Sequence, residues 1–322
     1  MRLHRRVLTL GIAVLLVSGT SACSPEPIVV IPSVSESAGV VPLVVGTPTV
    51  PDGGSALEGS LLANVYAAAL NAAGVKAVVS PVDANDPTSL SKLEQGGVDV
   101  LPGYSSLLLH AAVPSGPPDT VDATSASGVL SALKKALPAS VSMLDAASAQ
   151  DNDGLAVTAV TAEKYQLKTI EDLAKVCEKL VFGGSSAFRV SAYGVPALGS
   201  SYNCVPKGYE ELGTSKNELL LALIRDDVQV ADIHSSSPEI SNNALVVLND
   251  TKAIFPVQSV VPLVYSKKVP ADVEGVLNKV SAALDNDGLI NLNRLAAGNN
   301  YSTLAEAANA WLVQKGLLKA NS

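Results

Sequence analysis

The stretch VPLVVGTPTVPDGGSALEGSLLANVYAAALNAAGVKAVV, residues 41–79, decides the fold. Its first seven residues form an apolar run typical of a buried strand, residues 55–74 carry apolar side chains at helical spacing, and residues 75–82 again have the composition of a strand. A short helical stretch at 89–96 then leads into VDVLPGY, residues 98–104. Alternation of strands and helices predicts a parallel sheet covered by helices.

A second series of helices and strands follows without tandem sequence identity to the first, which predicts an α/β fold of two lobes. Ligands of open α/β sheets bind beyond the carboxyl ends of the strands, so the cleft between the lobes is the first candidate for a binding site. The segments of this second series are a helix at 169–180, a strand at 180–184, a helix at 216–226 and strands at 228–233 and 244–250.

The N-terminus has the composition of an export signal. A basic segment at 2–6 precedes the eleven-residue apolar run 7–17, which is too short for a membrane span of about 20 residues. Thr-Ser-Ala-Cys at 20–23 resembles a bacterial lipobox, although Thr20 stands where leucine is usual. We therefore expect residues 1–23 to be a lipoprotein signal peptide ending at a lipidated Cys23; soluble secretion after cleavage is the alternative.

Residues 24–41 mix Pro, Ser and Val without helical or alternating period, as expected of a tether. Charged residues make up 16% of the chain and the net charge is −8, which argues against nucleic acid or an anionic surface as the partner. Two further cysteines, Cys177 and Cys204, are an isolated pair. In an oxidising compartment such a pair predicts a disulfide, with two buried free thiols as the alternative.

Catalytic and metal-binding motifs are missing from the sequence. It holds three histidines, His4, His110 and His234, and none has zinc-ligand spacing with cysteines or carboxylates. Neither a G-x-S-x-G elbow, a Walker loop nor a dinucleotide fingerprint occurs. The sequence predicts a protein that is not an enzyme and that carries no cofactor and no metal.

Several longer segments carry a resemblance to a known family. GGVDVLPGYSS (96–106), VADIHSSSPEI (230–240) and IFPVQSVVPLV (254–264) are similar to it, and AVTAEKYQLKTIEDLA (159–174) and VLNKVSAALDNDGLINLN (276–293) are the most specific parts. The chain resembles the osmoprotectant-binding proteins of ABC importers, which take glycine betaine, choline, carnitine and related compatible solutes. The resemblance covers residues 41–318.

The resemblance implies a type II periplasmic-binding-protein fold with a hinge between the lobes. It also implies a small-molecule solute, a permease and separate ATPase subunits as partners, and an extracytoplasmic location on the cell membrane. The implied boundaries are lobe one at 42–148 plus 260–322, lobe two at 149–259, and crossovers near 145–153 and 257–264.

In this family a cage of tyrosines holds a quaternary ammonium, because a cation without hydrogen-bond donors is held best by aromatic faces. Tyr104 matches one cage position. Three other positions depart from the pattern, because Asp153 or its neighbour, His234 and Gln258 stand where aromatic residues are expected. Loss of cation–π contacts worth about 0.5 to 2 kcal/mol each favours a polyol, sugar-like or phenolic ligand, with a quaternary amine as the alternative.

The candidate ligand-binding set extends beyond the cage, and it has alternative interpretations. Tyr104 could simply cap its strand, His234 could be satisfied by local serines, Asp151 could cap a turn, and Arg189 could form a salt bridge instead of holding a ligand carboxylate. An exported binding-fold protein without a transport role is a third functional class. The full candidate set is Thr47, Tyr104, Ser105, Ser106, Asp151, Asn152, Asp153, Arg189, His234, Ser235 and Gln258.

Overall fold

A computed structural model describes residues 41–80, 89–116, 122, 124–212, 216–298 and 301–319. The expected signal peptide, with Cys23, and nearly all of the expected tether lie outside these residues. No helix within the described residues is both long enough and apolar enough to span a bilayer. Two five-stranded sheets and their helices make up the described part of the chain.

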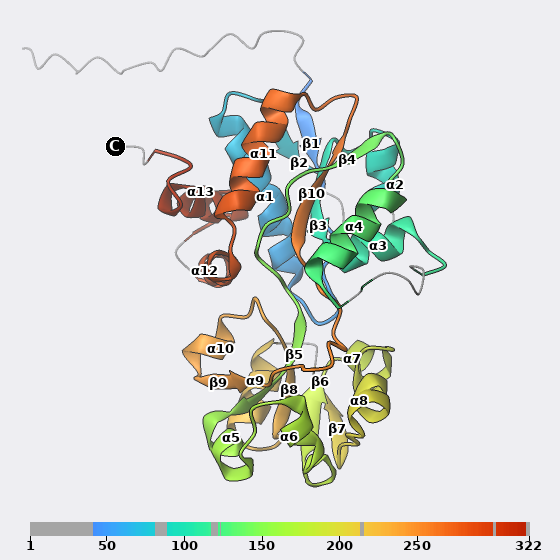
Figure 1. Cartoon of the computed structure of the whole chain (residues 1–322). Coiled ribbons are helices and arrows are strands. Elements are labelled where there is room, and N and C mark those ends of the chain that lie inside the picture. Colours follow the sequence, from blue (N-terminus) through green and yellow to red (C-terminus); the bar gives the residue numbers. More distant parts are fainter. Residues whose placement is uncertain are drawn as a thin grey trace, which may run out of the picture. The chain divides into compact units, whose positions relative to one another are not determined.

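The first sheet has the strand order β2-β1-β3-β10-β4, and we call it, with its helices, lobe one (Figure 1). β1 pairs in parallel with β2 and with β3, whereas β10 pairs antiparallel with β3 and with β4. The strands are β1 (Leu43–Val45), β2 (Ala77–Val79), β3 (Val100–Tyr104), β4 (Val141–Met143) and β10 (Val260–Tyr265).

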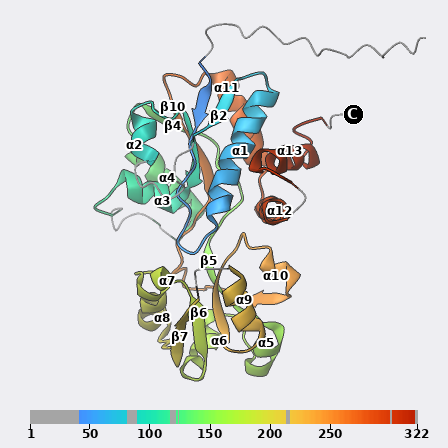
Figure 2. The same ribbon diagram turned by 180° about the vertical axis from the view of Figure 1, so that it is seen from behind.

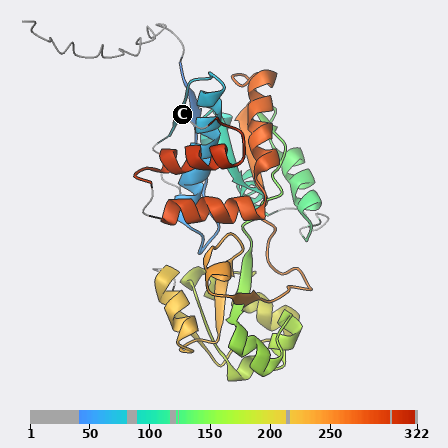
Figure 3. The same cartoon turned by 90° about the vertical axis from the view of Figure 1, so that its left-hand side faces the viewer.

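Helices cover both faces of the first sheet, because alternate strand residues point to opposite sides. Val45, Val100 and Val260 face one helical layer, and Leu101 and Val261 face the other. Figure 3 shows α12 and α13 side by side next to α1. The first layer is α1 (Ala56–Ala72), α11 (Ala271–Ala283), α12 (Asn286–Ala297) and α13 (Leu304–Gln314); the second is α2 (Ser89–Glu94), α3 (Ser105–Ala112) and α4 (Ala126–Ala136).

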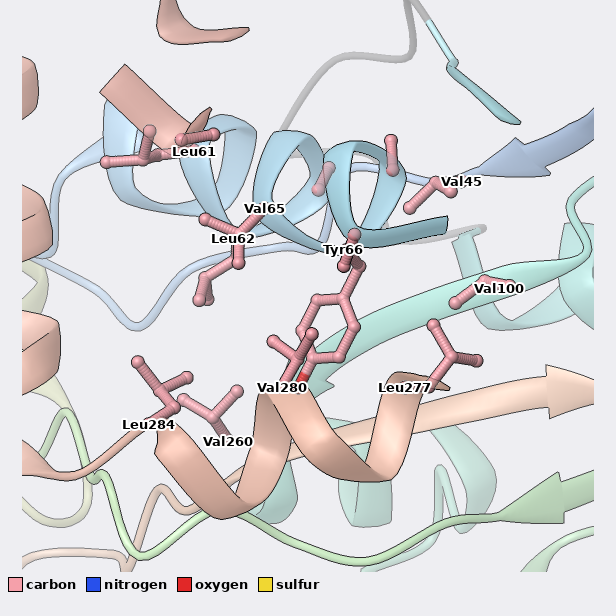
Figure 4. Packing of buried hydrophobic residues seen from close by; sticks show 14 of the residues in the cluster. Val45, Leu61, Leu62, Val65, Tyr66, Val100, Val260, Leu277, Val280 and Leu284 are labelled. Atoms are coloured by element: carbon pink, nitrogen blue, oxygen red, sulfur yellow. The ribbon is translucent and has the colours of Figure 1, made fainter. Parts of the chain in front are cut away.

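The core of lobe one is centred on Tyr66 of α1, which points toward Leu277 and Val280 of α11 (Figure 4). The tyrosine hydroxyl lies 3.1 Å from the Ser281 hydroxyl, so its polar end is satisfied although the side chain is fully buried. Trp311 of α13 is also fully buried and donates its indole N–H to the Gly288 carbonyl oxygen at 2.9 Å. The Tyr66 contact attaches α11 to α1, and the Trp311 contact joins α13 to α12.

The second sheet has the strand order β7-β6-β8-β5-β9, and we call it, with its helices, lobe two. β6 pairs in parallel with β7 and β8, whereas β5 pairs antiparallel with β8 and β9. The strands are β5 (Asp153–Thr158), β6 (Val181–Gly184), β7 (Gly208–Glu211), β8 (Val230–His234) and β9 (Leu245–Val247).

Lobe two is covered on both faces, as Figures 1 and 2 show from opposite sides. Leu223 of α9 packs on one face, and Leu173 of α6 and Leu198 of α8 pack on the other. The helices are α5 (Ala159–Tyr165), α6 (Ile170–Ala174), η1 (Cys177–Lys179), α7 (Ser186–Val190), α8 (Val195–Tyr202), α9 (Lys216–Ile224) and α10 (Glu239–Asn242).

Cys177 and Cys204 form a disulfide on the face of the second sheet that α6 and α8 cover. The bond joins η1 to the second residue after α8, with 5.4 Å between the Cα atoms and 27 residues of sequence separation. Both cysteines are buried in the apolar cluster of that face. The isolated pair in the sequence is therefore bridged in the structure.

Two expectations from the sequence were wrong in detail. Both sheets are mixed instead of parallel, because β5 and β10 enter their sheets from the crossovers. Asp153, the first residue of β5, pairs with His234, the last of β8, and Val260, the first of β10, pairs with Tyr104, the last of β3. A strand that begins where its neighbours end must run antiparallel to them.

The helix expected at 169–180 is interrupted. α6 is closed at its N-terminus by a capping box of Thr169 and Asp172, but it ends at Ala174. After Val176, which has a non-helical conformation, the chain continues as the short turn η1 around the disulfide residue Cys177. The apolar periodicity of this segment continues past the end of the helix, so periodicity alone did not reveal the break.

Candidate functional site

His234, the last residue of β8, lies among acidic side chains where β8 and β5 meet the β1–α1 loop. Its Nδ1 atom is 3.2 Å from Asp151 Oδ2, and its Nε2 atom is 3.3 Å from Asp153 Oδ1. Nε2 also lies 2.9 Å from the carbonyl oxygen of Asp52. The Asp151 contact is a close ion pair without an aligned hydrogen bond. The imidazole therefore contacts oxygen atoms on both of its nitrogens.

The imidazolium of His234 and the neighbouring carboxylates stabilise each other's charged forms. Burial opposes the charged imidazole, but Asp151, followed by Asp153 and Asp232, raises the pKa of His234 to about 10. Burial would raise the pKa of Asp151, yet the His234 charge overcomes it and holds that pKa below its usual value. Burial raises the pKa of Asp153 to about 6 despite His234. At neutral pH the cluster is thus built around an imidazolium.

A second buried acid, Glu58 in the first turn of α1, links the two lobes. Tyr104 donates its hydroxyl to Glu58 Oε1, and Asn293 of α12 donates its amide to Glu58 Oε2. The Asn293 amide also donates to the Ser236 carbonyl at 3.1 Å, and the Ser236 N–H donates to Asp151 Oδ1 at 3.3 Å. Burial, followed by the charge of Asp151, raises the pKa of Glu58 to about 7. A continuous buried network therefore runs from lobe one to the imidazolium cluster.

Gln258 and Asn152 join the two crossovers to each other. Gln258 Oε1 accepts from the backbone N–H groups of Ser106 and Leu107, at 3.2 and 3.3 Å, in the first turn of α3. The backbone N–H of Gln258 donates to Asn152 Oδ1 at 2.8 Å. The Gln258 carboxamide oxygen is therefore used to cap a helix.

The three serines of the candidate set also bind the crossovers. Ser105 and Ser106 both donate their hydroxyls to the Val257 carbonyl, at 2.9 and 2.7 Å. Ser235 donates its hydroxyl to the Gln150 carbonyl at 3.0 Å. These contacts attach the strand ends of each lobe to the segments that pass between the lobes.

The structure does not bring Arg189 or Thr47 into the cluster around His234. Arg189 forms an ion pair with Glu211 at 2.6 Å on the surface of lobe two, where the two side chains are 53% and 48% exposed. This contact is the salt-bridge alternative considered for Arg189. Thr47 is buried after β1, with its hydroxyl 3.5 Å from the Ser80 carbonyl.

Sequence reasoning missed four side chains that the structure gathers here: Glu58, Tyr193, Asp232 and Asn293. Asp232 precedes His234 by two residues on the same strand, so period-two alternation places both on one face. Tyr193 lies close enough to Asp52 and Asp153 for their charges, after partial burial, to raise its pKa. Asp232 was recognisable from its position in the sequence; Glu58 and Asn293 were not, since they meet across 235 residues.

A cavity of about 70 Å³ opens beside Asp232 and His234. Asp232 is 7% exposed, and its Oδ1 atom has no hydrogen-bond partner among the described residues. Gly53 has φ +84°, and a Cβ there would lie 3.2 Å from His234 Nε2, so glycine lets this loop approach the imidazole. The other lining residues are Ser185, Ser237 and Glu239, with Leu212, Leu219, Leu220, Leu223, Ala231, Ile233 and Leu245.

Tyr104 also lines a separate, mostly apolar cavity of about 250 Å³ in lobe one, together with Pro48, Leu101 and Leu108. The tyrosine itself is fully buried. Across the described residues, no group of three or more His, Cys, Asp or Glu side chains is arranged to hold a metal ion.

Comparison with known proteins identifies the family. The family model for the substrate-binding domain of the ABC-type glycine betaine transport system matches residues 55–314. The chain belongs to this family. It is a substrate-binding protein of an osmoprotectant-type ABC transporter, and the family consists of extracytoplasmic solute-binding proteins rather than enzymes. A small-molecule solute and an ABC permease are the partners that membership implies.

Solved structures show the same two-lobed type II binding-protein fold. A glycine betaine/carnitine/choline ABC transporter protein has a TM-score of 0.74 at 17% identity, covering 85% of this chain and 99% of that one. Apo YehZ from Escherichia coli has a TM-score of 0.69 at 22% identity, covering 86% and 100%. Lactococcal OpuAC, closed and complexed with glycine betaine, has a TM-score of 0.55 at 17% identity, covering 85% and 97%.

We expect Asn293→Ala to lower the free energy of unfolding by about 1 to 3 kcal/mol, because it leaves a buried Glu58 oxygen and the Ser236 carbonyl without their donor. Urea unfolding followed by circular dichroism measures this change. Asn291→Ala, on the same helix but with its amide bound to Gln314 at the surface, is the matched control. Equal losses in the two variants would contradict the buried network.

The imidazolium cluster predicts a pH dependence of stability. Because the pKa of His234 is raised from 6.5 to about 10, its contribution is complete below pH 6.5 and is lost as the pH rises through 10. The excess stability of the wild type over His234→Gln should therefore shrink steadily between pH 6.5 and 10 in urea unfolding. His110→Gln, at an exposed position on α3, should follow the wild type. A constant difference for His234→Gln over this range would show that the imidazole is neutral in the fold.

Proposed function

We propose that this protein is the lipid-anchored solute receptor of its importer, and that it captures a polar, hydrogen-bonding solute and delivers it to the permease. The observation that carries the ligand class is Asp232, which lines a cavity beside the imidazolium of His234 and whose buried Oδ1 atom has no hydrogen-bond partner among the described residues. A buried carboxylate oxygen without a donor costs about 1 to 3 kcal/mol or more. A solute that donates a hydrogen bond to it recovers that cost.

The residues at the expected cage positions support the same ligand class. Asp153 and His234, which stand at positions where the family resemblance predicts aromatic residues, are bound into the charged cluster. Gln258, at a third such position, caps α3. Asp153 and Gln258 have no aromatic ring, and a positively charged imidazolium repels a quaternary ammonium, so the ligand must be held largely by polar contacts.

A quaternary amine is the alternative ligand, and one observation favours it. Tyr104 is among the residues that line the apolar cavity of about 250 Å³, whose volume is large enough for a trimethylammonium group. Tyr193, partly buried near Asp52 and Asp153, adds a second aromatic ring close to negative charge. Cation–π contacts with two rings would give about 1 to 4 kcal/mol in this arrangement.

Capture would use the two crossovers as a hinge. Closure brings the β1–α1 loop of lobe one onto lobe two, where the Asp52 carbonyl meets His234. The Asn293 contact with Ser236 is a second bond between the lobes. A solute that binds more tightly when these contacts are made shifts the population toward the closed form, which is the form expected to dock on the permease.

Anchoring to the membrane through Cys23 is proposed from the sequence alone, since residues 1–40 lie outside the described structure. The apolar run 7–17 and the small residues before Cys23 support it. A tether of about 18 residues would let the folded part reach a permease in the same membrane.

Isothermal titration of the mature chain, residues 24–322, tests the ligand class. We expect at least one hydroxylated or N–H-bearing solute to bind tenfold or more tightly than glycine betaine, choline or carnitine, since loss of about 1.4 kcal/mol of cation–π energy is tenfold in affinity. Arg189→Ala should leave that affinity unchanged, because Arg189 is paired with Glu211. Glycine betaine binding more tightly than every polar solute would show that the quaternary-amine alternative is correct.

A further inference from the structure

Asp232 is the one acid of the cluster with a buried oxygen that contacts no cation and no donor among the described residues. Asp151 and Asp153 both contact His234, at 3.2 and 3.3 Å, whereas Asp232 Oδ1 has no hydrogen-bond partner. The side chain is more than nine-tenths buried and lines the cavity of about 70 Å³. Asp232 therefore combines a buried, unsatisfied acceptor oxygen with a side chain that borders the cavity.

The charge around this cavity is unbalanced. Among the described residues, Asp153 and the imidazolium of His234 act electrostatically on Asp232, and that imidazolium is already shared between Asp151 and Asp153. Burial, and next the charge of Asp153, raises the pKa of Asp232 well above its usual value. The groups that act on or border Asp232 are Asp153 on β5, His234 on β8 and Tyr209 on β7, and Glu239 on α10 lines the same cavity.

A cation with N–H groups suits this site better than a neutral or a quaternary solute. It neutralises the excess negative charge, and it donates to Asp232 Oδ1, which a quaternary ammonium cannot do. A polyol donates hydrogen bonds but leaves the charge imbalance in place.

The cavity also sets the size and the shape of the ligand. One water molecule needs about 10 to 15 Å³ of cavity volume, so the cavity of about 70 Å³ accommodates about five to seven heavy atoms. Leu219, Leu220 and Leu223 of α9 form an apolar wall away from the acids. The acids on one side of the cavity and the apolar wall on the other favour a short ligand with one polar and one apolar end.

We propose that the cleft binds a small organic cation that carries N–H donors and a short apolar chain, with its charged head on Asp232. This inference rests on the proposed function, since it narrows the solute class of the same site. Asp232 accepts a hydrogen bond from the ammonium as a carboxylate. Because burial raises the pKa of Asp232, binding of a cation favours loss of its proton to solvent.

The experiment is titration of the mature chain with n-butylammonium and with N,N,N-trimethylbutylammonium, which share charge and chain but differ in N–H donors. Erythritol and glycine betaine complete the probe set. We expect butylammonium to bind at least tenfold more tightly than its trimethyl analogue. Asp232→Asn should weaken butylammonium tenfold or more, whereas Asp227→Asn, at an exposed aspartate before β8, should not change it.

Proton release gives an independent readout. Titrations in phosphate and in Tris, which differ in ionisation enthalpy, should show release of up to about one proton per butylammonium bound by the wild type and none by Asp232→Asn. Equal or tighter binding of the trimethyl analogue, no binding of butylammonium, or no effect of Asp232→Asn would overturn the inference. If glycine betaine or erythritol bound while butylammonium did not, only this inference would fail; if no probe and no solute of the wider panel bound, the proposed function would fail as well.

Discussion

The ion pairs of His234 with Asp151 and Asp153 are the interaction on which the junction of the two lobes depends. A carboxylate as buried as Asp151 is tolerated only when it is paired and hydrogen-bonded. The imidazolium supplies that pairing and also meets the carbonyl of Asp52 from the β1–α1 loop. From Asp151 the buried contacts continue through Ser236 and reach lobe one. The imidazolium therefore stabilises several buried acids at this junction. The chain has few aromatic side chains that could fill the same space.

Strand direction explains why these groups meet at all. β8 ends and β5 begins at the same edge of the second sheet, and β3 ends and β10 begins at the corresponding edge of the first. Side chains at strand ends therefore converge with the two crossovers, whose own polar groups are held by Gln258 and Asn152. The candidate residues consequently have two roles. One group forms hydrogen bonds with the two crossovers, and the other lies around Asp232, which still has an oxygen without a hydrogen-bond partner among the described residues.

The sequence predicted the two-lobed α/β architecture because helical and strand periodicities are local. The direction of β5 and β10 depends on where the chain re-enters each sheet, and periodicity does not contain that information. Positions such as His234 could be placed at the cleft because strand ends are recognisable. Its pairing with acids from other elements, and the contact of Glu58 with Asn293, join residues far apart in sequence, so they required the three-dimensional structure.

The charge of His234 is the most direct test of this account. Long-range proton–nitrogen spectra of the mature chain, with side-chain ¹⁵N-labelled histidine, report protonation of each ring nitrogen, and His234→Gln assigns the signals against those of His110. With a pKa of about 10, both nitrogens of His234 should carry a proton at pH 8. An unprotonated ring nitrogen on His234 at pH 8 would contradict the imidazolium cluster at the lobe junction.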